Sequence, residues 1–275
     1  MLNFTGKVAL VTGAGSVGEG WGNGKATAVL LARLGARVCG ADLDPRALAA
    51  TTAILQAEGL ADCWLALPCN MTDSAQVKAV VDRCLARFGR IDVLVNNVGG
   101  SAPGDPASMP VDVWQAQLEL NLTTAFLGLK HVLPVMEAQF DASGKGGAIV
   151  NIGSVGSHTF QLGGRVSAGY AASKAGLEAL GRSTAIAYVR KGIRVNTVVP
   201  GSMHTPLVEH RLVRQLGADD AAALIARRHA AVPMGFMGDA WDVAHAVAYL
   251  ASDEARYITA TEIIVDGGMT AARIS

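Results

Sequence analysis

Short apolar runs alternate with helical stretches along this chain, and that alternation restricts the folds that it can adopt. Runs that are apolar throughout suit parallel strands buried on both faces. Strict alternation of strand and helix, without a break in composition, predicts a single doubly wound α/β domain over residues 1–275. We expect seven strands, at residues 7–12, 37–42, 63–68, 91–95, 147–152, 193–198 and 262–265.

A glycine-rich turn follows the first strand. Six glycines lie from Gly13 to Gly24, a helix is expected over residues 26–34, and the next strand ends at Asp42. This order of strand, glycine turn, helix and acid-ended strand is typical of the dinucleotide-binding unit. Glycines let the backbone approach a pyrophosphate, and the helix N-terminus stabilises its charge. We therefore predict dinucleotide binding by a Rossmann-type seven-stranded parallel sheet with helices on both faces.

The glycine turn is long, and two registers fit it. In the first, Gly13 acts together with Gly22 and Gly24; we favour this register because an alanine-rich helical stretch follows directly. In the second, the fingerprint is Gly13-x-Gly15-x-x-Gly18, which also satisfies the formal pattern. The individual phosphate contacts therefore stay open at this point.

The acid at the end of the second strand indicates which dinucleotide binds. The carboxylate of Asp42 can accept hydrogen bonds from both ribose hydroxyls of NAD, and it would repel the 2′-phosphate of NADP. Arg46 is the nearest following cation, and Lys25 lies at the exit of the glycine turn. We therefore predict NAD over NADP. Trp21, inside the turn, could fold over the cofactor or pack on a neighbouring element.

Tyr170 and Lys174 lie four residues apart in a segment that is expected to be helical to about residue 190. Residues i and i+4 share one helical face, so the ammonium of Lys174 can lie near the phenol of Tyr170. A nearby positive charge lowers the pKa of a phenol from its usual value of about 10, which favours acid/base chemistry at neutral pH. Such a pair is also common on solvated helices.

Other candidate groups follow the ends of expected strands. Asn97, Ser154 and residues 200–201 come after the fourth, fifth and sixth strands. Ligands of open α/β sheets bind at the carboxyl ends of the strands. These residues, with Gly13 and Asp42, are therefore predicted to line one site.

Composition argues against several other functions. The formal net charge is zero and only 5% of the residues are aromatic, so nothing favours binding to nucleic acid or to an anionic membrane. No apolar run approaches the roughly 20 residues of a membrane span. The chain leads directly into its first strand, so we expect no signal peptide and a cytoplasmic location. The four cysteines lack metal-ligand spacing, so we predict neither a metal site nor a disulfide.

Together these motifs resemble those of the short-chain dehydrogenase/reductase family over essentially the whole chain. Each motif is modest alone, but their joint order and spacing match the family. The matching pieces are Thr12-Gly13 with the glycines that follow, Asn96-Asn97-Val98-Gly99, Asn121, Ser154, Tyr170-x-x-x-Lys174, Pro200-Gly201-x-x-x-Thr205 and Asp266-Gly267-Gly268.

The resemblance implies roles for four side chains in hydride transfer between nicotinamide and a secondary alcohol or ketone. Tyr170 would be the catalytic acid/base, and Lys174 would bind the nicotinamide ribose and lower the pKa of Tyr170. Ser154 would hydrogen-bond the substrate oxygen. Asn121 would anchor a water that links Lys174 to solvent; a buried structural amide is the other interpretation.

The resemblance also implies a set of cofactor contacts. Asn70 stands where the family often has Asp, and its amide could still bond the adenine. In addition to Tyr170 and Lys174, the implied cofactor-binding residues are Gly13, Gly22, Asn23, Asp42, Leu43, Asn70, Met71, Asn97, Gly99, Met203 and Thr205.

The substrate is expected beneath an irregular lid at about residues 202–238, because long irregular stretches in compact domains are often binding loops. The apolar residues of the lid favour a largely apolar substrate. His158 could act as a second acid/base, but we favour a place in the pocket wall. The candidate substrate-binding residues are His158, Phe160, Leu162 and His204.

Alternative functions stay open. An NADP(H)-dependent ketoreductase, including the 3-oxoacyl type, fits the same motifs, as does a non-catalytic dinucleotide-binding protein. Relatives that reduce enoyl groups commonly space the Tyr and Lys further apart, so the spacing here argues against that reaction. The resemblance also implies a homotetramer or homodimer built on long helices at residues 111–138 and 170–190.

Overall fold

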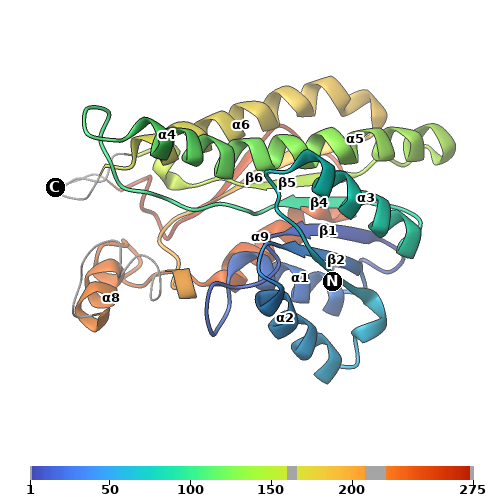
Figure 1. Ribbon diagram of the computed structural model, residues 1–275, viewed down its shortest axis with the longest axis horizontal. Coiled ribbons are helices and arrows are strands. Elements are labelled where there is room, and N and C mark those ends of the chain that lie inside the picture. Colours follow the sequence, from blue (N-terminus) through green and yellow to red (C-terminus); the bar gives the residue numbers. More distant parts are fainter. Residues whose placement is uncertain (1, 160–165, 208–220, 273–275) are drawn as a thin grey trace.

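A computed structural model describes residues 2–159, 166–207 and 221–272, to which the account below is confined. The strands form one parallel sheet in the order β3-β2-β1-β4-β5-β6-β7 (Figure 1). The predicted Rossmann-type fold is confirmed, and strand order reverses between β1 and β4. The strands are β1 Val8–Thr12, β2 Arg37–Asp42, β3 Trp64–Pro68, β4 Val93–Asn96, β5 Ala148–Ile152, β6 Arg194–Pro200 and β7 Glu262–Val265.

Helices cover both faces of the sheet (Figure 1). α1, α2 and α9 pack on one face, and α3, α5 and α6 pack on the other. Ala9 and Val11 of β1 contribute to the first core, whereas Val8 and Leu10 contribute to the second, because successive side chains of a strand point to opposite faces. The helices are α1 Asn23–Arg33, α2 Pro45–Ala57, α3 Ser74–Phe88, α4 Val111–Leu118, α5 Thr124–Ser143, α6 Ala168–Tyr188, α8 Ala221–Ala230 and α9 Ala240–Ala251.

Local signals in the sequence set several helix ends. Asp73 caps α3 by accepting hydrogen bonds from two backbone N–H groups, and Asp44 caps α2, with Pro45 in the first turn. Gly35 and Gly59 follow α1 and α2 with φ angles of 96° and 73°. Only glycine adopts this left-handed region without strain, so these residues end the helices cleanly.

The helical region expected over residues 111–138 is interrupted. α4 ends at Leu118, a π-helical turn spans Glu119–Thr123, and α5 then continues to Ser143. The turn holds Asn121, whose side chain is fully buried. Single π-turns inside helices often occur at functional sites, which directs attention to this residue.

The expectation that residues 202–238 are irregular is wrong in one part. α8 lies within this stretch, and Figure 1 shows it beside the main body of the molecule. Alanine is the best helix former, and α8 has four alanines between residues 222 and 230. Leu224 is buried, so the helix is also anchored by packing.

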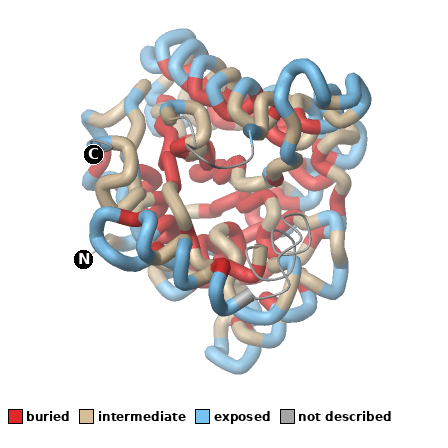
Figure 2. The backbone as a smooth tube through the Cα atoms, turned by 90° about the vertical axis from the view of Figure 1, so that its left-hand side faces the viewer, coloured by how far each residue is buried: buried red, intermediate tan, exposed pale blue. Residues whose placement is uncertain are grey.

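Buried segments lie at the centre of the molecule and exposed loops and helices surround them (Figure 2). Cys39, Cys69 and Cys84 are buried, Cys63 is partly buried, and all four thiols are free. Within the described residues, no helix combines the length and the apolarity needed to cross a membrane.

Candidate active site

A large cavity, with a volume of about 1020 Å³, lies at the carboxyl edge of the sheet. Residues that follow successive strands line it, as the reversal of strand order between β1 and β4 leads one to expect. The structure brings Gly13, Asp42, Asn97, Ser154 and residues 200–201 together in this cavity.

The glycine turn favours the register that uses Gly22 and Gly24. α1 begins at Asn23 with Gly22 as its N-cap, and no side chain caps this N-terminus. A Cβ atom at Gly24 would lie 1.9 Å from the carbonyl oxygen of Gly13, so only glycine allows the two segments to approach.

The same turn fits a pyrophosphate. The hydroxyl of Ser16 is buried without a hydrogen-bond partner among the described residues, and Ser16 lines the cavity. Uncapped N–H groups at the start of α1 add a positive dipole end. A dinucleotide phosphate would supply acceptors for the Ser16 hydroxyl and for these N–H groups.

Trp21 does not line this cavity. Its ring packs against Trp241 of α9, with 4.6 Å between the ring centroids. Lys25 donates a hydrogen bond to the carbonyl of Gly20 at 3.0 Å, and its Nζ atom lies 5.1 Å from the Trp21 ring centroid. The packing interpretation of Trp21 is therefore the correct one.

Asp42 is held in a fixed orientation at the end of β2. Its Oδ2 atom accepts a hydrogen bond from the Gly15 N–H at 2.9 Å, and its Oδ1 atom accepts one from the Asp44 N–H at 3.0 Å. The nearest following cation, Arg46, pairs with Asp44 at 3.3 Å. The carboxylate of Asp42 is therefore positioned by the backbone and is not neutralised by Arg46.

Asn97 and Gly99 have a structural role. The Asn97 side chain donates hydrogen bonds to the carbonyls of Thr12 and Gly13, each at 3.1 Å. A Cβ atom at Gly99 would lie 3.0 Å from Lys174 Nζ. The loop after β4 therefore fixes the glycine turn on one side and contacts the Tyr170 helix on the other.

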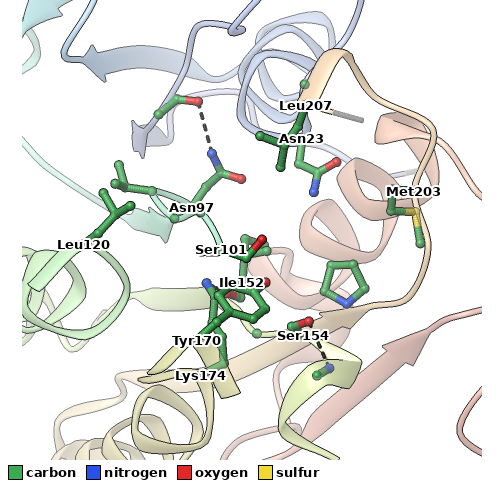
Figure 3. Close-up of a pocket in the computed structure, with 18 of the residues that line it drawn as sticks. Asn23, Asn97, Ser101, Leu120, Ile152, Ser154, Tyr170, Lys174, Met203 and Leu207 are labelled. Carbon is green, nitrogen blue, oxygen red and sulfur yellow. Dashed lines mark hydrogen bonds between the residues drawn. The ribbon is translucent and has the colours of Figure 1, made fainter. Parts of the chain in front are cut away.

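Ser154, Tyr170 and Lys174 lie side by side in the cavity (Figure 3). The hydroxyl groups of Tyr170 and Ser154 share a hydrogen bond. Ser154 Oγ also accepts a hydrogen bond from the Gly156 N–H at 3.0 Å. Lys174 Nζ donates one to the carbonyl of Ile152 at 2.7 Å, which joins α6 to β5.

Burial dominates the protonation of this group. It raises the pKa of Tyr170, and the hydrogen bond with Ser154 offsets this only in part. It lowers the pKa of Lys174 to about 8, against the attraction of Glu178. In the protein chain itself the pKa of Tyr170 is shifted upward by burial, and the lowering by Lys174 with the nicotinamide bound stays a prediction.

The comparison with known proteins decides the family. A family model described as Enoyl-(Acyl carrier protein) reductase matches residues 18–270. The crystal structure of a short-chain dehydrogenase/reductase from Burkholderia xenovorans is 48% identical in sequence, with 100% of each chain covered and a TM-score of 0.92. The chain belongs to the short-chain dehydrogenase/reductase family.

Two further relatives agree with this assignment. The 3-oxoacyl-(acyl-carrier-protein) reductase FabG of Escherichia coli is 38% identical over 268 residues, which cover 98% of this chain and 99% of that protein. The cis-4-hydroxycyclohexanecarboxylate dehydrogenase of Sinomonas cyclohexanicum is 39% identical over 269 residues, with 98% of each covered. This short-chain dehydrogenase/reductase is an oxidoreductase, and its family binds a nicotinamide dinucleotide.

In this short-chain dehydrogenase/reductase, the Asn121 side chain fixes the loop that contains Gly100 by hydrogen bonds. Its Oδ1 atom accepts a hydrogen bond from the Gly100 N–H at 2.9 Å. Its Nδ2 atom donates to the carbonyls of Gly100 and Gln117 at 3.0 and 2.9 Å. These bonds match the structural-amide interpretation, and they use one of the two lone pairs of Oδ1. The proton-relay role stays a prediction.

His158 belongs to the cavity wall and to a charged cluster behind it. Its Nε2 atom lies 3.4 Å from Glu178 Oε1 and 3.3 Å from Glu262 Oε2. These three groups lie within 4.8 Å of one another, which is close enough to hold a metal ion. However, Glu262 also pairs with Arg182, and Glu178 accepts a hydrogen bond from Ser157, so the carboxylates have partners within the protein.

The other substrate-binding candidates fare differently. Phe160 and Leu162 lie outside the described residues. His204 does not line the large cavity; it borders a separate small one beside Trp21 and Trp241, and its ring lies 5.8 Å from that of His229. His204 is therefore not among the described residues that line the large cavity; its backbone N–H is bonded to the Gly238 carbonyl, and its substrate-binding role stays a prediction.

The remaining predicted cofactor residues all line the cavity. Sequence reasoning missed Ser16, Ser101 and Arg228, which also line it. Ser16 and Ser101 lie in loops, where no periodic sequence pattern marks them. Arg228 reaches the cavity only through the packing of α8, which the sequence does not reveal. The predicted residues confirmed as lining are Gly13, Gly22, Asn23, Asp42, Leu43, Asn70, Met71, Asn97, Gly99, Met203 and Thr205.

Replacing Gly24 with Ala is expected to disrupt the dinucleotide site. The added Cβ atom would lie 1.9 Å from a backbone oxygen, and overpacking of this kind costs about 1–3 kcal/mol of unfolding free energy. Gly22→Ala is the matched control for stability, because its Cβ atom would meet Ser16 Oγ at an ordinary 3.5 Å, and NADH affinity is compared with that of the wild type. Urea unfolding and fluorescence titration with NADH measure the two effects. Equal stability of both variants, with a wild-type NADH affinity in Gly24→Ala, would contradict the close-approach argument.

Proposed function

We propose that this enzyme is an NAD(H)-dependent oxidoreductase that transfers a hydride between nicotinamide and the carbinol carbon of a secondary alcohol or ketone. The observation that carries the proposal is the meeting of Ser154, Tyr170 and Lys174 in the cavity that also contains the dinucleotide cradle. The names of the two relatives, a reductase of an oxo group and a dehydrogenase of a hydroxyl group, support this reaction class.

The residues divide the reaction between them. The nicotinamide supplies or accepts the hydride. The Ser154 hydroxyl donates a hydrogen bond to the substrate oxygen and polarises the carbonyl. Tyr170 is protonated at neutral pH because burial raises its pKa, so in the direction of reduction it can donate the proton to the forming alkoxide. Lys174, whose pKa is about 8, is largely protonated at neutral pH, so its positive charge can stabilise the phenolate.

Reduction of an enoyl group is a second candidate, because the matching family model bears that description. The four-residue spacing of Tyr170 and Lys174 supports the alcohol and ketone reaction, since the resemblance associates enoyl reduction with a wider spacing. A test panel of alcohols and ketones should therefore include a crotonyl thioester.

Tyr170→Phe is expected to lower turnover by about 100-fold to 10,000-fold, the usual contribution of a general acid or base. The dissociation constant for NAD should stay within a few-fold, because the phenol hydroxyl is a small part of the cofactor site. Absorbance of NADH follows turnover, and calorimetry follows binding. Tyr257→Phe, on a side chain that is almost fully exposed, is the control. Near-normal turnover by Tyr170→Phe would refute the proposed role.

We further propose NAD as the cofactor, on the basis of Asp42. Its carboxylate lies at the ribose end of the cavity, and a 2′-phosphate there would meet a negative charge. Wild-type kcat/KM should favour NADH over NADPH by about 10-fold or more, and Asp42→Asn should reduce that ratio while keeping the side-chain shape. A wild-type preference for NADPH would show that this proposal fails, without touching the role of Tyr170.

Residues 202–238 would form a lid that covers the substrate.

The family resemblance supports a homotetramer or a homodimer, located in the cytoplasm. Phe126 of α5 and Ile186 of α6 are exposed apolar side chains that an interface would cover. Light scattering at micromolar protein concentration should report two or four subunits, and Ile186→Glu should shift the mass downward. A wild-type monomer at that concentration would contradict the assembly.

A further inference from the structure

Arg228 is a cation on the wall of the active-site cavity. It comes from α8, lines the cavity and is partly buried. Its Nη2 atom donates a weak hydrogen bond to Ser202 Oγ at 3.5 Å, whereas its Nε atom is buried and has no hydrogen-bond partner. The guanidinium therefore still has an N–H group that can donate a hydrogen bond to a ligand.

No carboxylate among the described residues pairs with Arg228. Asp266, which follows β7 and contacts Gly201, uses its two oxygens to accept hydrogen bonds from the N–H groups of Gly268 and Thr270 at 2.8 and 2.7 Å. Burial lowers the pKa of Arg228, and no acid among residues 2–159, 166–207 and 221–272 opposes that effect. A buried cation without a counter-ion costs free energy, so a ligand anion would remove a penalty that the free protein carries.

The position of Arg228 in the fold assigns it to the end of the cavity near Ser154, where the reaction would take place. Its partner Ser202 follows β6, and β6 lies next to β5, after which Ser154 follows by two residues. The pyrophosphate cradle follows β1, and β4 and β5 separate β1 from β6. An anion bound by Arg228 is therefore more readily part of the substrate than part of the dinucleotide.

We propose that Arg228 binds a carboxylate of the substrate, so that the enzyme acts on secondary hydroxy acids and the corresponding oxo acids. This inference rests on the proposed function. The fork of a guanidinium matches a carboxylate through two parallel hydrogen bonds. The described lining holds two other basic residues, His158 and Lys174, and each already contacts acceptors of the protein. A single unpaired guanidinium fits one carboxylate better than a phosphate dianion.

The apolar lining fits the same class of substrate. Val155, Met203 and Met269 line the cavity together with Arg228. A hydroxy acid with an apolar spacer would place its carboxylate on Arg228 and its hydroxyl at Ser154 and Tyr170. The largely apolar substrate expected from the sequence therefore gains one charged end.

The test uses 3-hydroxybutyrate, 4-hydroxypentanoate and 5-hydroxyhexanoate, each beside its methyl ester, which keeps the hydroxyl and removes the charge. For the best acid, wild-type kcat/KM should exceed that of its ester by about 10-fold to 100-fold, as expected for a charge-assisted contact. In Arg228→Gln, kcat/KM for the acid should fall by that factor, whereas kcat/KM for the ester should stay within about threefold of the wild-type value. Arg228→Lys should retain part of the preference for the acid over the ester. Arg227→Gln, on the exposed neighbour in α8, is the matched control and should change neither.

Two results would overturn the inference. One is an equal loss on acid and ester in Arg228→Gln, which would mean that the residue only positions α8. The other is weaker NAD binding by Arg228→Gln with an unchanged acid-to-ester ratio, which would place Arg228 on the cofactor.

A separate measurement distinguishes failure of the proposed function. If neither acids nor esters are turned over, calorimetric titration of hexanoate into the NAD-saturated protein still decides the role of Arg228. Binding to wild type that is lost in Arg228→Gln supports the subsite, and equal binding or no binding in both proteins overturns it.

Discussion

The contact between Asn97 and the glycine turn is the constraint on which the active site depends. β1 and β4 are neighbours where the strand order reverses, and the Asn97 side chain joins the segments that follow them by donating to the carbonyls of Thr12 and Gly13. Gly24 then packs against Gly13 so closely that no side chain fits, which sets the start of α1 relative to β1. The uncapped N-terminus of α1, the buried Ser16 hydroxyl and the orientation of Asp42 follow from that placement.

The catalytic candidates depend on a second rigid connection. Tyr170, Lys174 and Glu178 lie at four-residue intervals on α6, and the bond from Lys174 to Ile152 fixes that helix face to the end of β5. Ser154 follows the same strand two residues later. The hydroxyl pair of Ser154 and Tyr170 is thus set by α6 and β5, two elements in the protein core, and the loops adjust little of its geometry. Burial raises the pKa of the phenol and lowers the pKa of Lys174 to about 8, so at neutral pH the phenol is neutral and the lysine is still largely charged.

Sequence reasoning succeeded where local pattern decides structure. The apolar runs predicted the strands, and the four-residue spacing of Tyr170 and Lys174 placed both in the cavity. It failed where tertiary packing decides. A Cβ atom at Gly24 would lie 1.9 Å from the Gly13 carbonyl oxygen, and no composition rule contains that distance. The direction of His204 and the approach of Arg228 both depend on how the segment after β6 folds back, which periodicity does not encode. The pKa of Tyr170 is raised mainly by burial, which a pairwise argument from Lys174 does not include.

The two ends of the cavity carry opposite charges, although the formal net charge of the chain is zero. Asp42 and Asp44 lie at the end that follows β2, and Lys174 and Arg228 lie at the end formed by α6 and α8. A cofactor with ribose hydroxyls at one end of the cavity and a substrate with a negative group at the other would satisfy both ends. The reversed arrangement would place anions against carboxylates and leave Arg228 unpaired. Local charge placement, and not the overall field of the protein, therefore favours one orientation for the ligands, and that orientation brings the nicotinamide end beside Ser154 and Tyr170.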